Sequence, residues 1–178
     1  MKHVLNGILF SVLIVFHAAG QPGAGGGQAV AALTAQVNKM GHAFINGDYR
    51  TFGSYIYPKI VAMIGGPDKL AAQMDQVIAQ MKGQGLRFSK ISFDAPSGIV
   101  TSGHELQCMV PQHTEMLQGS DRIVTTSTLI AISADGGKDW TFVDTSNKDM
   151  ATIRRLLPNL NAGIVIPPQQ PPVRNPGR

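Results

Sequence analysis

The sequence predicts an α+β domain in which helices come first and an antiparallel sheet follows. Three observations lead to this fold class. Apolar residues in the first half of the chain recur at spacings of three and four, which is the pattern of one helix face. After Gly85 the spacing moves towards two, as in strands. Asp135-Gly136-Gly137 is a hairpin turn signal, and the segregation of helices from strands favours α+β over α/β.

The first expected helix covers residues 30–45. Its apolar stripe consists of Val30, Leu33, Val37, Met40, Phe44 and Ile45. Asn46-Gly47 ends it, because glycine adopts the left-handed conformation that closes helices. Asp48 is then placed to cap a short second helix with Phe52 as its buried anchor.

Two further helices are expected before the sheet. Each begins at a proline, Pro58 or Pro67, which the first turn of a helix tolerates. Gly65-Gly66 ends the first of them, and Gly83 and Gly85 end the second. The buried face of the second is expected to be Leu70, Met74, Val77, Ile78 and Met81.

Extended segments are expected after these helices. They cover residues 86–93, 99–101, 105–117, 122–133 and 140–145. In the first, Leu86 and Phe88 alternate, whereas Ile91 and Phe93 alternate one step out of phase. This phase slip predicts a β-bulge near Ser89-Lys90.

The end of the chain is expected to leave the sheet. Ser146 and Asp149 are spaced like a capping box, so they should open a last short helix that stops at Pro158. Five prolines follow from Pro167 onwards with little apolar content. We therefore expect residues 167–178 to be a disordered tail, with a PxxP ligand as the alternative.

Residues 1–20 have the composition of a cleavable signal peptide. An apolar run from Ile8 to Phe16 is followed by the small residues Ala18-Ala19-Gly20, which predicts cleavage before Gln21. The run is well short of the roughly 20 residues that span a bilayer, which disfavours an uncleaved anchor. We expect an exported protein, periplasmic or secreted, without membrane attachment after cleavage.

The remaining boundaries follow from composition. Residues 21–27 are expected to be a glycine-rich linker, and residues 28–166 one domain. The formal net charge is +4, but removing Lys2, Arg174 and Arg178 from the 15 basic residues leaves 12 against 11 acidic residues in that domain. A nucleic-acid surface needs clustered positive charge. We therefore expect no nucleic-acid partner.

No disulfide, metal site or cofactor is expected. Cys108 is the single cysteine, and we interpret it as a small buried side chain, with a reactive thiol as the alternative. The five histidines include no i, i+4 pair, whereas zinc or iron needs three or four converging ligands. Dinucleotide, P-loop and nucleophile-elbow motifs are also missing from the sequence.

The sequence resembles the NTF2-like (SnoaL-like) superfamily. The resemblance is carried by Ala43-Phe44-Ile45-Asn46-Gly47-Asp48-Tyr49 at the end of the first helix, followed by Phe52. Residues 57–61 with Gly65-Gly66, residues 140–144 and residues 157–160 are similar to uncharacterised exported members. The resemblance covers residues 28–166 and implies a cone, in which a curved antiparallel sheet wraps around N-terminal helices and encloses an apolar pocket. Members include isomerases, dehydratases, hydrolases and non-enzymatic binders, so the fold alone does not set the function.

Six residues are the candidates for ligand binding in that pocket. They are His42, Tyr55, Tyr57, Gln112, Trp140 and Asp144. Asp144 is the weak catalytic candidate, because it is in phase with Trp140 on one strand and a carboxylate in an apolar pocket would have a raised pKa. The alternative is that Asp144 bonds a loop or caps the last helix.

Each of the other candidates has a structural alternative. His42 lies beside the apolar stripe, where a partly exposed histidine is also expected. Gln112 and His113 are neighbours on one strand, so their side chains point in opposite directions and at most one faces the cavity. Tyr55 and Tyr57 are placed at the cone opening, with ordinary packing as the alternative.

The expected function is that of an exported non-enzymatic domain that binds a small apolar ligand or a protein partner. A homodimer through the open sheet face is part of this expectation. One alternative is a small cofactor-independent lyase, isomerase or hydrolase that uses Asp144 with a tyrosine or histidine. A second alternative is an envelope scaffold whose proline-rich tail makes the contacts.

Overall fold

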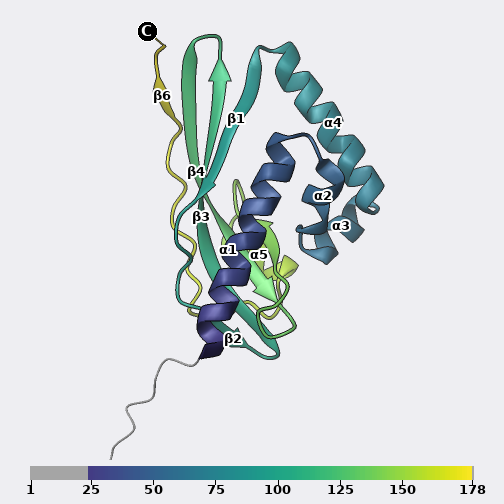
Figure 1. Cartoon of the computed structure of the whole chain (residues 1–178), viewed down its shortest axis with the longest axis vertical. Coiled ribbons are helices and arrows are strands. Elements are labelled where there is room, and N and C mark those ends of the chain that lie inside the picture. Colours follow the sequence, from purple (N-terminus) through teal and green to yellow (C-terminus); the bar gives the residue numbers. More distant parts are fainter. Residues whose placement is uncertain (1–23, 178) are drawn as a thin grey trace, which may run out of the picture.

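The computed structural model describes residues 24–177, so the predicted signal peptide lies outside the described residues. In this part of the chain, helices precede the sheet and one short helix follows β5 (Figure 1). The helices are α1 (Ala24–Ile45), α2 (Tyr49–Ser54), α3 (Pro58–Ile64), α4 (Pro67–Gly83) and α5 (Met150–Leu156). The predicted α+β fold class is confirmed.

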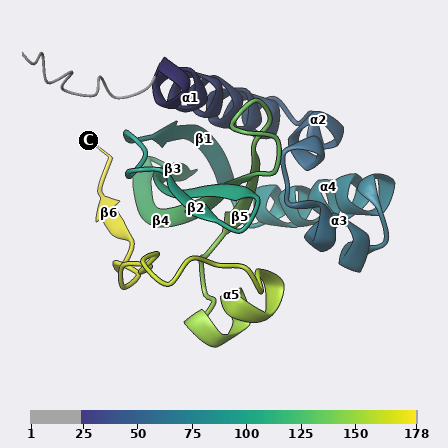
Figure 2. The same cartoon turned by 90° about the horizontal axis from the view of Figure 1, so that it is seen from below.

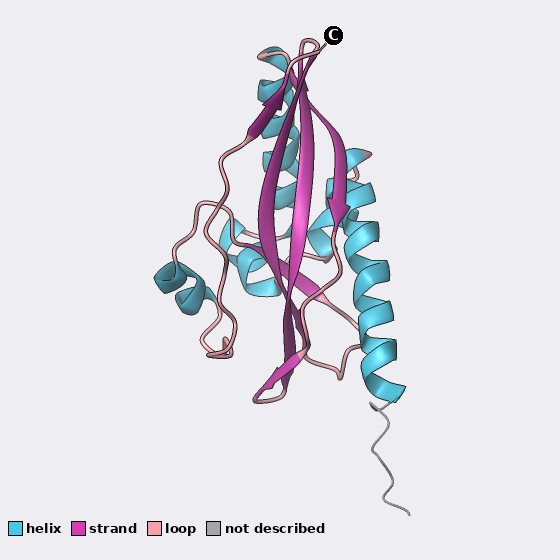
Figure 3. Cartoon of the chain, turned by 90° about the vertical axis from the view of Figure 1, so that its left-hand side faces the viewer, coloured by secondary structure: helices cyan, strands magenta, loops and turns pink. Residues whose placement is uncertain are grey.

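The strands form one antiparallel sheet. They are β1 (Leu86–Phe93), β2 (Val100–Ser102), β3 (Glu105–Gln118), β4 (Asp121–Ser133), β5 (Thr141–Asp144) and β6 (Val173–Asn175). The main order is β1-β3-β4-β5, with β2 added to β3 and β6 added to β4. The long hairpin of β3 and β4 is the spine of the sheet, and Figure 3 shows it running the length of the molecule.

The sheet curls strongly around α1, as expected from the sequence (Figure 2). Leu33, Val37 and Met40 on α1 are buried against the concave face, where they meet Cys108, Val110, Leu129 and Ala131. A buried helix stripe therefore fills the half-barrel. The Gln36 side chain fixes the helix to the loop before β5, because its Oε1 accepts a hydrogen bond from Trp140 N at 2.9 Å.

The opposite face of the sheet is covered at one end by α5 and the chain that follows it (Figure 2). Ile130, Ile132 and Val143 of the sheet pack there against Ile153 and Leu157. The sheet is thus buried on both faces along part of β4, which explains why β4 reads as a nearly continuous apolar run at its end.

Gln107 ties this C-terminal segment to β3. Its side chain is fully buried, and its Nε2 donates to Glu105 Oε2 at 2.8 Å and to Asn159 O at 3.1 Å. Its Oε1 accepts from Asn161 N at 2.9 Å. One buried amide therefore satisfies three polar groups where the loop after α5 crosses the sheet.

Helices α2, α3 and α4 lie to the side of the sheet and are less buried. Leu70 and Ile78 are buried on α4, whereas no residue of α3 is. The predicted buried face of α4 is therefore wrong in part, because Val77 is 49% exposed. The reason is that α4 contacts α2, α3 and β1 along a narrow line and has no layer above it.

Three local predictions have clear outcomes. The bulge near Ser89 is confirmed, since the β1–β3 register shifts between Phe88 and Lys90. The glycine-rich linker is shorter than expected, because α1 begins at Ala24. The capping box is wrong: Asp149 itself is the N-cap of α5 and accepts from Thr152 N at 2.7 Å.

The proline-rich tail also differs from the expectation of a disordered segment. Val173–Asn175 forms β6 and pairs with β4, so part of the tail has a defined place on the sheet. Among the described residues, none of the helices has both the length and the apolar character needed to cross a bilayer.

Candidate ligand cavity

A cavity of about 190 Å³ lies between the concave face of the sheet and the helices α1 and α2. Its wall is mostly apolar. Met40, Phe44 and Phe52 line it from the helices, Ile56 from the segment between α2 and α3, and Phe88, Ile91, Leu129 and Phe142 from the strands. Apolar concave sites with a few converging polar groups are the usual form of small-molecule binding sites.

Phe44 organises the aromatic part of this wall. Its ring makes edge-to-face contacts with Phe88, Phe52 and Tyr49, at centroid distances of 4.9, 5.3 and 6.0 Å. Such geometry places ring edges against ring faces and is favourable for aromatic pairs. The cluster joins α1, α2 and β1 around one end of the cavity.

Gln112, Thr114 and Asp144 supply the polar groups of the cavity. Gln112 and Thr114 follow one another on the concave side of β3, and Gln112 Nε2 donates to Ser127 Oγ at 3.3 Å. Asp144 is the one exposed residue of the lining, so it marks the side open to solvent. The lining is therefore mostly apolar, with an amide and a hydroxyl among its half-buried and buried residues and a carboxylate on the exposed side.

The Asp144 carboxylate is already engaged by its own loop. Its Oδ1 accepts from Ser146 N at 2.8 Å and from Ser146 Oγ at 2.7 Å. This is the alternative that the sequence left open, in which Asp144 bonds a loop. These two bonds hold the carboxylate to the residue two positions later in its own loop.

Tyr55 and Trp140 lie outside the cavity lining. Trp140 is buried in the core and its Nε1 donates to Gly137 O at 3.0 Å, so its polar atom is used within the fold. Tyr55 packs against the same core, and its backbone oxygen accepts from Phe142 N at 2.8 Å. Both residues therefore pack behind the cavity lining and are not part of it.

His42 and Tyr57 also point elsewhere. His42 is exposed on α1. Tyr57 lies at a separate shallow hollow with Glu105 and Thr141, and burial, followed by the nearby Glu105 charge, raises the pKa of its hydroxyl. Neither residue approaches Asp144 to make the acid–base pair that a catalytic site would need.

The neighbours Gln112 and His113 do lie on opposite faces of β3. Gln112 faces the cavity, whereas the His113 ring bonds Asp94 Oδ2 at 2.9 Å and Thr126 Oγ1 at 3.2 Å on the other side. His113 on β3 therefore bonds β4 and the residue that follows β1 on the outer face.

Cys108 is a core residue with no exposed surface. Burial raises the pKa of its thiol to about 12, which suppresses the reactive thiolate. Within residues 24–177, the histidine, cysteine, aspartate and glutamate side chains form no group of three that is arranged to hold a metal ion.

A larger hollow of about 510 Å³ lies on the opposite side of β4, but its walls are less suited to a fixed ligand. The tail segment Ile166–Gln170 and the loop 145–150 form much of it, and the tail residues 167–170 are exposed. We therefore take the cavity beneath α1 as the candidate site.

Sequence reasoning placed Gln112 and Asp144 in the pocket and missed Thr114, Phe44 and Phe88 as lining residues. Strand alternation was a usable signal for Thr114, because it stands two residues after Gln112. Phe44 was assigned only to the helix stripe, and nothing local to Phe88 shows that it faces Phe44.

No family model matches the sequence, and searches of curated proteins and of solved structures found no significant similarity.

Proposed function

We propose that this protein is an exported, NTF2-like domain that binds a small apolar ligand carrying one hydrogen-bonding group. The supporting observation is the cavity beneath α1, with mostly apolar walls and the Gln112 amide in its lining. The order of elements and the curled sheet around α1 agree with the cone that the sequence resemblance implies. The composition of residues 1–20 supports export.

The size of the cavity limits the ligand. An apolar cavity of roughly 150 Å³ holds benzene, so about 190 Å³ accommodates a single ring with one substituent. A hydroxyl on that ring can bond the Gln112 amide, either by donating to Oε1 or by accepting from the second N–H of Nε2, whose first N–H is donated to Ser127 Oγ. The ligand class is therefore a small phenol-like or similarly monocyclic compound.

We propose that the cavity binds its ligand without catalysis by Asp144. Its carboxylate is exposed and bonded to Ser146, and neither His42 nor Tyr57 reaches it. A ligand hydroxyl bonded to Gln112 would therefore have no pair of acid and base side chains beside it.

Phenol and toluene are the probes for this proposal. A titration of the purified protein with each compound, followed by NMR shifts and by the thermal unfolding midpoint, measures occupancy. We expect both compounds to raise the midpoint and to shift signals of Phe44 and Leu129, since a ligand that binds only the native state stabilises it. Phenol should bind a few-fold more tightly, because one added hydrogen bond contributes about 0.5–1.5 kcal/mol.

Two substitutions locate the site. Leu129→Phe fills the cavity and should abolish both shifts, whereas Gln112→Met should remove only the preference for phenol. Gln73→Met, on the exposed side of α4, is the matched control and should change neither. Unchanged phenol binding by Leu129→Phe would contradict the proposal, and turnover of a substrate that depends on Asp144 would favour the lyase, isomerase or hydrolase alternative.

A further inference from the structure

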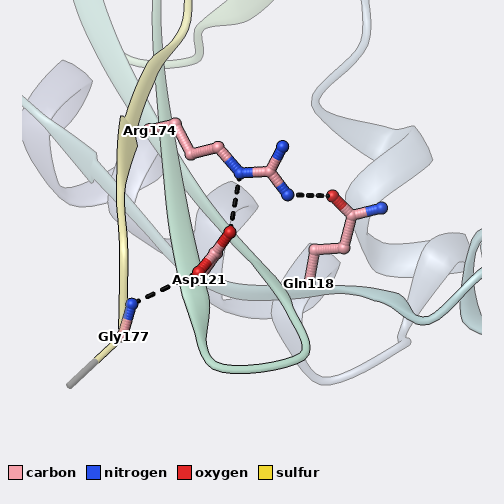
Figure 4. A network of polar contacts seen from close by, with 4 residues as sticks. All are labelled: Gln118, Asp121, Arg174 and Gly177. Carbon is pink, nitrogen blue, oxygen red and sulfur yellow. Dashed lines mark hydrogen bonds and ion pairs between the residues drawn. The ribbon is translucent and has the colours of Figure 1, made fainter.

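The tail strand β6 occupies the free edge of β4 at the hairpin end of the sheet, far from the first turn of α1 (Figures 1 and 4). Arg174 Nε bonds Asp121 Oδ2 at 2.8 Å, and its terminal nitrogen donates to Gln118 Oε1 at 2.7 Å. Gly177 N donates to the other oxygen of Asp121 at 3.3 Å. Two residues of the hairpin therefore recognise one arginine and the backbone beyond it.

Prolines set the length of this strand. Val173 pairs with Val124 and Asn175 with Arg122, and a proline stands on each side of the paired triplet. A proline has no backbone N–H to donate, so pairing cannot extend in either direction. The tail thus carries a three-residue strand with defined ends.

Gly177 adds a steric requirement. It lies so close to Ser120 that a Cβ atom at position 177 would overlap the Ser120 backbone. The edge of β4 is therefore a shaped acceptor with a charge at Asp121, a backbone ladder at residues 122–124 and room only for glycine at its end.

The interactions that hold the tail on the edge of β4 are weak, although its position there is well defined. Residues 167–177 are all exposed, and the side chains of Arg174 and Asp121 are 56% and 30% exposed. Exposed ion pairs contribute little, about 0.2–1 kcal/mol each. Ile166 is the last residue that packs against the apolar body, and the proline-rich connection 167–172 beyond it spans about 19 Å when extended. One hydrogen bond holds this connection, from Asn147 N to Gln169 Oε1 at 3.2 Å.

We propose that β6 is an exchangeable strand: the edge of β4 accepts the tail of its own chain in the monomer and the tail of a second copy in a reciprocal dimer. Every contact of residues 173–177 is repeated when two copies exchange tails, and only the connection 167–172, with its single bond to Asn147 N, changes its path. The same-chain tail competes at an effective concentration of roughly millimolar. The single chain therefore stays closed at micromolar concentration, and exchange prevails when closure within one chain is blocked. This inference concerns the hairpin end and does not rest on the proposed ligand.

A pair of charge-reversed full-length variants tests the exchange. Asp121→Arg spoils the acceptor and keeps the tail, whereas Arg174→Asp keeps the acceptor and spoils the tail. Each variant alone has a mismatched tail, but in a mixture both acceptors find a tail of opposite charge. We expect each variant to be monomeric at micromolar concentration and the equimolar mixture to form a heterodimer, measured by light scattering and by mass spectrometry of isotope-labelled chains.

Three controls separate exchange from other causes. The double variant Asp121→Arg/Arg174→Asp should close within one chain and remain monomeric. Arg154→Asp, with the same change of charge on α5, should not dimerise with Asp121→Arg. Adding Gly177→Val to the Asp121→Arg chain should weaken the heterodimer, because the tail that it supplies no longer fits beside Ser120.

Hydrogen exchange of the backbone amides of residues 173–175 shows whether the tail strand is bound or released in each sample. Loss of protection in both single variants with its return in the mixture supports the proposal. A mixture that stays monomeric with released tails overturns it. Retained protection in either single variant also overturns it, since the ion pair would then not hold the tail, and self-association of one variant alone would show edge-to-edge pairing instead.

Discussion

The two halves of the molecule differ in how they are held together. In the sheet half, α1 fills the concave face, α5 covers part of the other face, and buried residues such as Leu33 and Ile130 have no exposed surface. In the helical half, made of α2, α3 and α4, few side chains are buried and Met63 is 69% exposed. One half is a close-packed core, and the other is a thin layer beside it.

The candidate cavity lies where these halves meet. Leu129 and Phe142 form a wall on the sheet, whereas Phe52 lies on α2 and Ile56 just after it, both in the thin layer. Regions with few buried contacts open at lower free energy than the core does. The difference between the halves thus gives the cavity one fixed wall and one that can adjust to a ligand.

The largest expected effect is a direct test of this contrast. Leu33→Ala in α1 should lower the free energy of unfolding by about 2–5 kcal/mol, because it leaves a cavity in a closed core. Val77→Ala in α4 should change it by less than about 0.5 kcal/mol, because the side chain is half in water. Urea denaturation followed by circular dichroism measures both values.

Equal losses for the two variants would contradict the division into halves. Val→Ala gains a few tenths of a kcal/mol more helix propensity than Leu→Ala does, and this difference is small beside the effect expected for Leu33→Ala. Native-state amide exchange of α4, expected to be faster than that of β3 and β4, provides an independent check.

The sequence was sufficient for the sheet half and insufficient for the helical half. The stripe of Leu33, Val37 and Met40 and the alternation in β3 predicted which faces meet, since both patterns repeat along one element. The exposed side of α4 could not be predicted, because Val77 sits in a regular apolar stripe and only the missing layer above it decides its exposure. Periodicity shows which face is apolar but not whether anything covers it.

The same limit explains the candidate site. Gln112 was found because polar residues in the middle of a strand stand out, and Asp144 because it shares the phase of Phe142. Trp140 was misplaced, since nothing in the sequence shows that its ring nitrogen is used by Gly137. The ordered part of the tail was hidden by its prolines, which limit β6 to three residues but do not prevent it.

A smaller loss of stability is expected when Gln107, the buried polar side chain that bonds the loop after α5, is replaced. Gln107→Leu keeps the volume and removes the bonds to Asn159 O and Asn161 N. Asn159 is exposed and Asn161 is half-buried, so water can reach these groups and each lost bond costs about 0.5–1.5 kcal/mol. We therefore expect the loss of stability to be clear but below that of Leu33→Ala, measured again by urea denaturation.

Exposed Gln73→Ala is the matched control for Gln107 and should be close to neutral. If Gln107→Leu were neutral as well, the loop after α5 would be fixed to the sheet by its apolar residues alone. The buried amide would then not distinguish the sheet half from the helical one.

The smallest effect concerns the acid limb of the pH–stability curve. The backbone N–H of Asp139 and the Ser133 hydroxyl, with help from Lys138 N, hold the pKa of Asp135 below its ordinary value of 3.8. A carboxyl group whose pKa is lower in the folded chain stabilises the fold above its unfolded pKa, and this contribution disappears as the pH falls through the folded value. Stability should therefore decline below about pH 4.

Asp135→Asn should flatten this decline in part, because the amide oxygen still accepts hydrogen bonds but does not titrate. Asp48→Asn at the start of α2 should flatten it as well, since the pKa of Asp48 is lowered by Thr51. If the two halves unfold separately, Asp48→Asn will act only on the signal of the helical half, as followed by amide exchange at pH 3 and pH 6. Equal effects of both substitutions on every probe would mean that the thin layer and the core unfold as one unit, because a single cooperative transition senses a proton bound anywhere in the chain.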